Sequence, residues 1–150
     1  IAFLPGDGIG RDVTAEVRLF VESLSEAGLA ELEVTELDWG ADRYLSTGEG
    51  VPSGGFDMLR KCDAIFVGAF GDPRVPDAIH AREILLGMRR ELDLFVNFRP
   101  VRCLDERLNP LKGVSAADID MAFFRENTEG LYAGIGGALR RAAMACCRRR

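Results

Sequence analysis

The sequence predicts an α/β protein in which helices pack against a largely parallel sheet. Short apolar segments alternate with segments of helical periodicity over the first 70 residues. Turns rich in glycine or proline separate the two kinds of segment. Alternation of this kind favours parallel strands joined by helical crossovers.

The elements follow in order along the chain. Apolar or alternating runs predict strands at residues 1–4, 32–37, 63–68, 94–101 and 120–124. Helical periodicity predicts one helix that ends at Gly28 and two more over residues 56–61 and 81–92. The first helix carries one apolar face, made of Val13, Val17, Phe20, Val21 and Leu24. The last carries a face that we expect to be buried, made of Ile84, Leu85, Met88 and Leu92.

Composition excludes several classes of protein. The 150 residues are 47% hydrophobic and 29% charged, which is typical of a globular chain with a core. A net charge of −5 argues against a nucleic-acid partner, and no apolar run is long enough to span a membrane. The four cysteines, at 62, 103, 146 and 147, fit no zinc pattern with the single His80, for which we expect a loop position. A reduced, cytoplasmic protein is the simplest interpretation.

Three arginines lie beside apolar runs. Arg89 falls on the last predicted helix, next to Arg90, and for that pair a solvated position is the competing interpretation. Arg99 lies between bulky apolar residues, so we expect it to be partly buried and to need an acidic partner or an anionic ligand. The guanidinium group matches a carboxylate in two hydrogen bonds, so Arg89, Arg99 and Arg125 together indicate a small di- or tricarboxylate ligand.

The run from Arg125 to Tyr132 places a cation, two carboxylates and a phenol at the end of an apolar segment. That segment, residues 119–124, reads as a buried strand, and chemistry in α/β proteins gathers at strand ends. Two alternatives remain open. Glu126 or Glu129 could satisfy Arg125 within the protein, and Tyr132 could be a packing residue.

Two glycine-bearing turns follow predicted strands. Residues 6–10 have the spacing GxGxG, not the GxGxxG of dinucleotide-binding folds, and a plain tight turn is the favoured interpretation. Residues 68–73 form a second such loop. If both lie at one edge of the sheet, they outline a single crevice.

Three motifs occur in a fixed order, and together they carry a resemblance. They are Leu-Pro-Gly-Asp-Gly-Ile-Gly at 4–10, Leu-Leu-Gly-Met-Arg-Arg-Glu-Leu-Asp-Leu-Phe-Val-Asn-Phe-Arg-Pro at 85–100, and Arg-Glu-Asn-Thr-Glu-Gly-Leu-Tyr at 125–132. Over residues 1–137 the chain resembles the N-terminal part of the metal-dependent β-decarboxylating dehydrogenases. This family acts on isopropylmalate, isocitrate, homoisocitrate or tartrate/D-malate.

The resemblance implies roles for particular residues. Substrate carboxylates would be bound by Arg89, Arg99 and Arg125, and Tyr132 would supply a proton after decarboxylation. Leu85 and Leu86 would contact the substrate side chain, which favours an isopropyl group. The residues implied at the cofactor are Ile9, Gly71, Asp72, Asp77 and Arg82. The cofactor would be NAD, with a Mg²⁺ or Mn²⁺ ion whose ligands do not lie in this chain.

The resemblance also implies a division of the chain. We expect an isopropylmalate-dehydrogenase-like mixed sheet flanked by helices, present only as its N-terminal portion. Residues 1–100 would belong to the first, cofactor-side domain and residues 101–137 would begin the second, dimerisation domain. Residues 138–150 form an atypical tail rich in Arg, Ala and Cys. A shifted reading frame in a GC-rich gene is our hypothesis for the tail, and an intact gene without the shift would refute it.

The expected activity of the intact enzyme, a homodimer, is NAD-dependent oxidative decarboxylation of a 2-hydroxy dicarboxylate. The favoured substrate is 3-isopropylmalate, with tartrate/D-malate, homoisocitrate and isocitrate as alternatives. A different class of function is a truncated or regulatory subunit that binds a carboxylate without turnover. A degraded reading frame with no function is the third interpretation.

Overall fold

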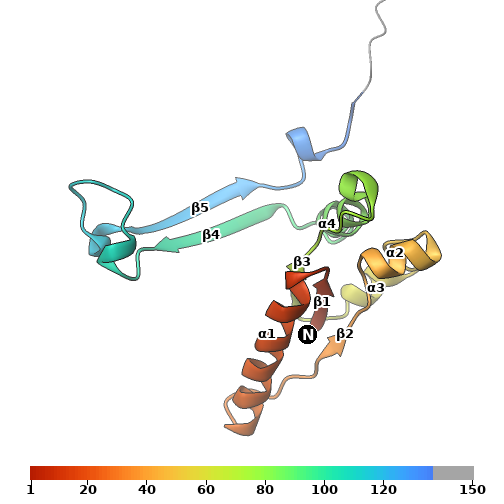
Figure 1. The fold of residues 1–150 in the computed structure, drawn as a ribbon, viewed down its shortest axis with the longest axis horizontal. Helices are drawn as coiled ribbons and strands as arrows, with labels where there is room; N and C mark the ends of the chain where they lie inside the picture. Colours follow the sequence, from red (N-terminus) through yellow and green to blue (C-terminus); the bar gives the residue numbers. More distant parts are fainter. Residues whose placement is uncertain (137–150) are drawn as a thin grey trace, which may run out of the picture.

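The computed structural model describes residues 1–136 and confirms the predicted α/β class (Figure 1). Its helices and strands, in chain order, are β1 (Ala2–Gly6), α1 (Ile9–Glu26), β2 (Thr35–Glu36), α2 (Ala41–Thr47), α3 (Gly55–Leu59), β3 (Ile65–Ala69), α4 (Ile79–Glu91), β4 (Val96–Arg102) and β5 (Asp120–Glu126). Four short 3-10 helices are η1 (Pro76–Ala78), η2 (Glu106–Leu108), η3 (Ala116–Asp118) and η4 (Gly130–Tyr132). The atypical tail lies outside the described residues.

A parallel sheet in the order β2-β1-β3 forms the centre of the compact part. Ala2 pairs with Thr35 on one side and Ile65 on the other, so the start of β1 is flanked by a strand on both sides. Ala2, Phe3 and Leu4 are all buried, as the predicted first strand requires. The carboxyl ends of β1 and β3 meet at one edge of the sheet, which brings together the loops that follow them.

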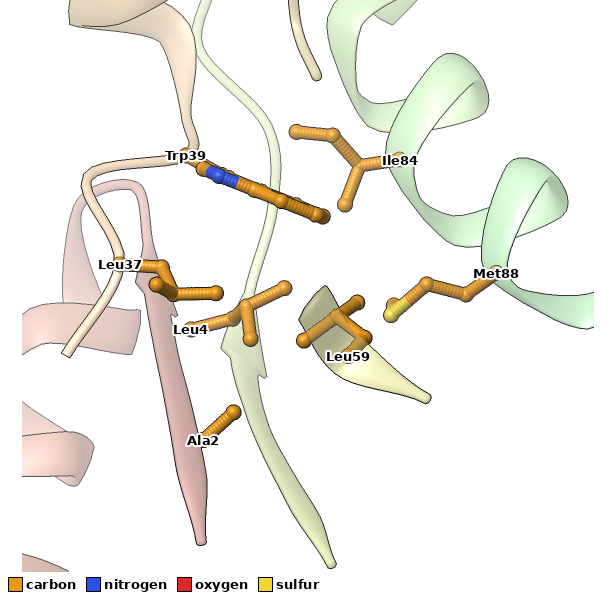
Figure 2. Packing of buried hydrophobic residues seen from close by; sticks show 7 residues of the cluster. All are labelled: Ala2, Leu4, Leu37, Trp39, Leu59, Ile84 and Met88. Carbon is orange, nitrogen blue, oxygen red and sulfur yellow. The ribbon is translucent and has the colours of Figure 1, made fainter. Parts of the chain in front are cut away.

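The main core lies on the face of the sheet that α3 and α4 cover. Figure 2 shows side chains from β1, α3, α4 and the segment after β2 converging there. The cluster consists of Ala2, Leu4, Leu37, Trp39, Leu59, Ile84 and Met88. Trp39 meets the edge of Phe56 at a centroid distance of 6.0 Å. The buried side predicted for the last helix is confirmed by Ile84 and Met88, while Leu85 and Leu92 are half-buried.

The first helix packs on the sheet through glycine. A Cβ atom added to Gly68 of β3 would lie 2.2 Å from the carbonyl oxygen of Pro5, and one added to Gly10 of α1 would lie 2.3 Å from the same oxygen. Only residues without a side chain permit that approach. The turn predicted at residues 6–10 is present, with positive φ at Gly6 and Gly8.

Strands β4 and β5 form a separate antiparallel ribbon that projects from the compact part (Figure 1). Phe98 and Phe124 stack on one face of it, at a centroid distance of 5.0 Å. Phe124 is nonetheless 73% exposed, so the prediction of a buried strand over residues 119–124 is wrong. The reason is that nothing within residues 1–136 covers either face of the ribbon, although Ile119 at its tip is buried.

Other predicted elements are also less buried, or shorter, than expected. On α1, Val21 is buried, but Phe20 is 62% exposed and Val13 also faces outward. The strand predicted over residues 32–37 is reduced to the two residues of β2, at the edge of the sheet. Strand β3, which falls on the strand predicted over residues 63–68, is half-buried along most of its length.

We predict that Gly68→Ala lowers the free energy of unfolding by about 1–3 kcal/mol, because the new methyl group meets backbone that cannot move aside. Urea denaturation followed by the fluorescence of Trp39, the single tryptophan, measures the change. Gly136→Ala is the matched control, since an added Cβ there meets nothing within 4 Å. Equal stability of the two variants would contradict the close packing of α1 on the sheet.

Candidate functional site

A buried carboxylate lies at the edge of the sheet where β1 and β3 end. Asp7 is 3% exposed and follows β1 directly. Its Oδ1 accepts the backbone N–H of Ala41 at 2.7 Å, at the start of α2. Its Oδ2 accepts the backbone N–H of Gly71 at 2.9 Å and lies 2.7 Å from Nε2 of His80. One side chain therefore joins the loop after β1 to α2, to the loop after β3 and to α4.

Burial alone raises the pKa of Asp7, since it disfavours the charged form. The hydrogen bonds from Ala41, His80 and Gly71 outweigh burial, so the pKa is lowered from its usual value. The group is a carboxylate at neutral pH, surrounded by donors. His80 lies in α4 and is fully buried, so the predicted loop position was wrong. Sequence reasoning also missed Asp7. The sequence feature that could have identified it is an acid placed between two glycines.

The exposed surface next to this centre carries a chain of charges. The guanidinium of Arg74 donates to Asp72 at 2.6 Å and to Asp42 at 2.7 Å, and Asp42 also accepts from Arg11 at 2.6 Å. The donation from Arg74 lowers the pKa of Asp72 to about 2. The loop after β3 is thus linked at its surface to the first turns of α1 and α2.

The five residues predicted at the cofactor come from three neighbouring segments. Ile9, at the start of α1, is 69% exposed, and Gly71 and Asp72 follow β3. Asp77 is in η1 with a φ of 53°, and Arg82 is exposed on the first turn of α4. An added Cβ at Gly71 would meet nothing within 4 Å, so the space beside this residue is open. The role of these residues stays a prediction.

A second group of side chains gathers where the ribbon joins the compact part. The Nη1 atom of Arg125 donates to the hydroxyl of Tyr132 at 2.9 Å. The guanidinium carbons of Arg89 and Arg125 lie 5.2 and 5.0 Å from the centroid of the Tyr132 ring. Two cations therefore flank one phenol, and their attraction to its ring partly offsets their mutual repulsion.

Asn127, which sequence reasoning overlooked, is buried beneath this group. Its Oδ1 accepts Nη2 of Arg125 at 2.9 Å, and its Nδ2 donates to the carbonyl of Leu94 at 3.1 Å. Its backbone N–H donates to Phe95 at 2.9 Å. Asn127 thus fastens the end of β5 to the turn that leaves α4, and so fixes Arg125 relative to Arg89.

The acids in the motif do not satisfy Arg125. The carboxylate of Glu126 turns back on its own segment, where it accepts the hydroxyl of Thr128 at 2.6 Å and the N–H of Glu129 at 2.6 Å. The Thr128 hydroxyl is the main cause that lowers the pKa of Glu126 to about 2. Within residues 1–136, no carboxylate lies within ion-pair distance of Arg89, Arg99 or Arg125.

Arg99 is exposed, so the predicted partial burial was wrong. It lies two residues after Asn97, which is the cross-strand partner of Arg125, so Arg99 and Arg125 share one face of the ribbon. Its Nε donates to Asn97 at 2.8 Å. Of the two leucines predicted at the substrate, Leu85 packs against the core cluster, and Leu86 is half-buried on the neighbouring position of α4.

Comparison with known proteins assigns the chain to a class. A family model described as isocitrate/isopropylmalate dehydrogenase matches residues 1–145, a range that extends into the tail. The 3-isopropylmalate dehydrogenase of Thermobifida fusca is 44% identical over 141 residues, which are 94% of this chain and 40% of that protein. The one from Rhodococcus erythropolis is 46% identical over 141 residues, with 93% and 40% covered. The chain therefore spans about 40% of the length of these relatives.

Solved structures agree. An isocitrate dehydrogenase from Methylococcus capsulatus matches 93% of this chain and 38% of its own, with a TM-score of 0.70 and 25% identity. A β-decarboxylating dehydrogenase from Thermococcus kodakarensis matches 92% of this chain and 36% of its own, with a TM-score of 0.59 and 26% identity. The chain belongs to the isocitrate/isopropylmalate dehydrogenase family, a family of decarboxylating dehydrogenases, as its motifs predicted.

Two features are absent from residues 1–136. No group of three or more histidines, cysteines and acids that could hold a metal ion occurs in the part of the chain that the structure describes. None of the helices within residues 1–136 has the length and apolar character that crossing a membrane requires.

We predict that Asp7 contributes stability that depends on pH. Its folded-state pKa is lowered, so this contribution is complete above the unfolded value of about 4 and is lost as pH falls through the folded value. Asp7→Asn should therefore destabilise the protein at neutral pH, by about 1–3 kcal/mol, and flatten the acid limb of its stability curve. Urea denaturation at a series of pH values measures both effects. Asp63→Asn, at an exposed loop position, is the control. Parallel acid limbs for Asp7→Asn and the unsubstituted protein would refute the assignment.

Proposed function

We propose that this chain forms the N-terminal part of an NAD-dependent 3-isopropylmalate dehydrogenase, the part that carries the substrate-binding arginines. The enzyme yields 4-methyl-2-oxopentanoate in leucine biosynthesis. The observation that carries the proposal is the cluster of Arg89, Arg125 and Tyr132. Two guanidinium groups lie over one phenol ring there, and neither pairs with an acid within residues 1–136. Relatives that are 43–46% identical to this chain are named 3-isopropylmalate dehydrogenase, which favours this substrate.

The arginines bind and orient the substrate in this proposal. Arg89 and Arg125 present donors near one phenol, and Arg99 extends from the same face of the ribbon as Arg125. Because no acid within residues 1–136 neutralises them, a substrate with two carboxylates supplies the missing negative charge. Each charged hydrogen bond contributes about 1.5–3 kcal/mol to binding.

Tyr132 is the proposed proton donor. Its hydroxyl oxygen accepts a hydrogen bond from Arg125, so the phenolic proton is directed away from the arginine and can be given to a neighbouring carbon. NAD bound there would supply the acceptor for the hydride from the hydroxyl-bearing carbon of the substrate. Ile9, Gly71, Asp72, Asp77 and Arg82 would border its nicotinamide end. The Mg²⁺ or Mn²⁺ ion of this proposal would be held by ligands outside residues 1–136.

The substrate side chain would contact Leu86 and the exposed part of Leu85. An apolar contact favours an isopropyl group over a third carboxylate or a hydroxyl, because burying a polar group without a partner is costly. The alternatives are isocitrate, homoisocitrate and tartrate/D-malate. We further propose a homodimer in the cytoplasm, and a boundary between two domains near residue 100, which falls within β4.

We predict that a chimera is active in which residues 1–136 replace the matching segment of the Thermobifida fusca relative. NADH formation with Mn²⁺ should be fastest, in kcat/KM, with 3-isopropylmalate. Preference for isocitrate, homoisocitrate, tartrate or D-malate would reassign the substrate. A folded chimera that binds 3-isopropylmalate without forming NADH would instead support a carboxylate-binding subunit. The unmodified relative is the control for assembly.

In the same chimera we predict that Arg125→Lys lowers kcat/KM by about 10–100-fold, because lysine cannot donate to the substrate, Tyr132 and Asn127 in one plane. Arg107→Lys is the matched control, since Arg107 is exposed in η2 and pairs only with Asp105 among the described residues. A loss below about twofold for Arg125→Lys would remove Arg125 from the substrate site.

A further inference from the structure

The loop between β3 and α4, residues 71–78, is held at both ends by one oxygen atom. We call this segment the strap. The N–H of Gly71, at its start, donates to Oδ2 of Asp7 at 2.9 Å. His80, just past its end, reaches the same Oδ2 through Nε2 at 2.7 Å. The other oxygen of Asp7, Oδ1, accepts the N–H of Ala41. The two ends of the strap are therefore joined through Oδ2 alone.

The backbone of the strap is strained close to His80. Asp77 and Ala78 both have left-handed backbone conformations, with φ of 53° and 48°. Non-glycine residues adopt this conformation infrequently and at an energetic cost, and two in succession are rarer still. Such strain persists only where surrounding contacts hold it. The contacts that hold the strap include the buried side chain of Val75, the bond from Arg74 to Asp42 and the His80 contact.

His80 makes a single polar contact. Its ring is fully buried and lies 6.1 Å from the ring of Tyr44, and its Nδ1 has no hydrogen-bond partner among residues 1–136. A carboxylate accepts but does not donate, so the imidazole proton must sit on Nε2 for the 2.7 Å contact to be a hydrogen bond. The bond therefore joins α4 to β1 across 73 residues of sequence.

We propose that His80 is a positioning residue, and that its hydrogen bond to Asp7 holds the strap closed against the strain at Asp77 and Ala78. Loss of the bond releases the strap locally, while the core cluster and the ribbon stay in place. The consequence for the cofactor rests on the proposed function, because Gly71, Asp72 and Asp77 would then leave the nicotinamide end. Closure of the strap itself does not depend on that function.

Limited trypsin digestion of the purified protein tests the proposal, because Arg74 is an exposed cleavage site inside the strap. Arg107, in the ribbon's tip, is the internal reference. His80→Leu keeps an apolar body but removes the donor, and His80→Gln keeps a donor at the same number of bonds from the backbone. We expect His80→Leu to raise cleavage after Arg74 by about tenfold, with cleavage after Arg107 changed by less than about twofold. His80→Gln should stay within about threefold of the unsubstituted protein at both sites.

Three results would overturn the proposal. The first is cleavage after Arg74 that is as fast as cleavage after Arg107 in the unsubstituted protein. The second is an equal rise at both sites in His80→Leu, which would mean global destabilisation. The third is a His80→Gln protein that behaves like His80→Leu. No cofactor or substrate enters the assay, so failure here is distinct from failure of the proposed function.

The nitrogen NMR spectrum of the imidazole gives a second readout that global stability does not affect. His80 is the only histidine, so its signals need no assignment. We expect a proton on Nε2 in the unsubstituted protein, and a changed Nε2 shift in Asp7→Asn. A proton on Nδ1 with a bare Nε2 would overturn the proposal, because two acceptors would then face each other.

Discussion

The structure depends on satisfying one buried negative charge. Removing a carboxylate from water is expensive unless donors replace the water, and Asp7 finds its donors in three segments far from it in sequence. Each donor is therefore fixed relative to the end of β1. The same constraint places the starts of α2 and α4 and the loop after β3 around the carboxyl ends of β1 and β3. The geometry of that sheet edge follows from the charge as much as from the apolar core beneath it.

The arginine cluster is held by hydrogen bonds and cation–ring contacts and not by a buried carboxylate. Arg89 comes from α4, whereas Arg125 and Tyr132 come from the end of β5 and from η4. Asn127 bridges these parts through one acceptor and two donors, so the cluster sits at the base of the ribbon and not along it. Both guanidinium groups lie over the same phenol ring, and an amide oxygen accepts a hydrogen bond from one of them. This arrangement leaves positive charge to be balanced by a ligand.

Sequence reasoning succeeded where local pattern determines the outcome. The period of apolar residues was enough for β1, α1 and α4, and the order of three motifs was enough for the family. It failed for Arg99 and for residues 119–124, because the burial of a strand depends on which other elements pack against it. A local sequence pattern does not show those elements. The pairing of Asp7 with His80 lay beyond it as well, since a single sequence does not relate residues 73 positions apart. Asn127 was visible inside a known motif, but its role needed the neighbouring turn at Leu94.

The long separations around Asp7 also bear on the order of folding. Its contacts close loops of 34, 64 and 73 residues, so each needs two segments that are distant in sequence to be brought together first. We therefore expect these bonds to be absent from the rate-limiting step of folding and to be among the first lost on unfolding. Substitution of Asp7 would then speed unfolding and leave the folding rate almost unchanged. A chevron plot in which Asp7→Asn slows folding instead would place this charge in the folding nucleus. On the expected outcome, the carboxylate governs how long the native state persists, not how quickly it is reached.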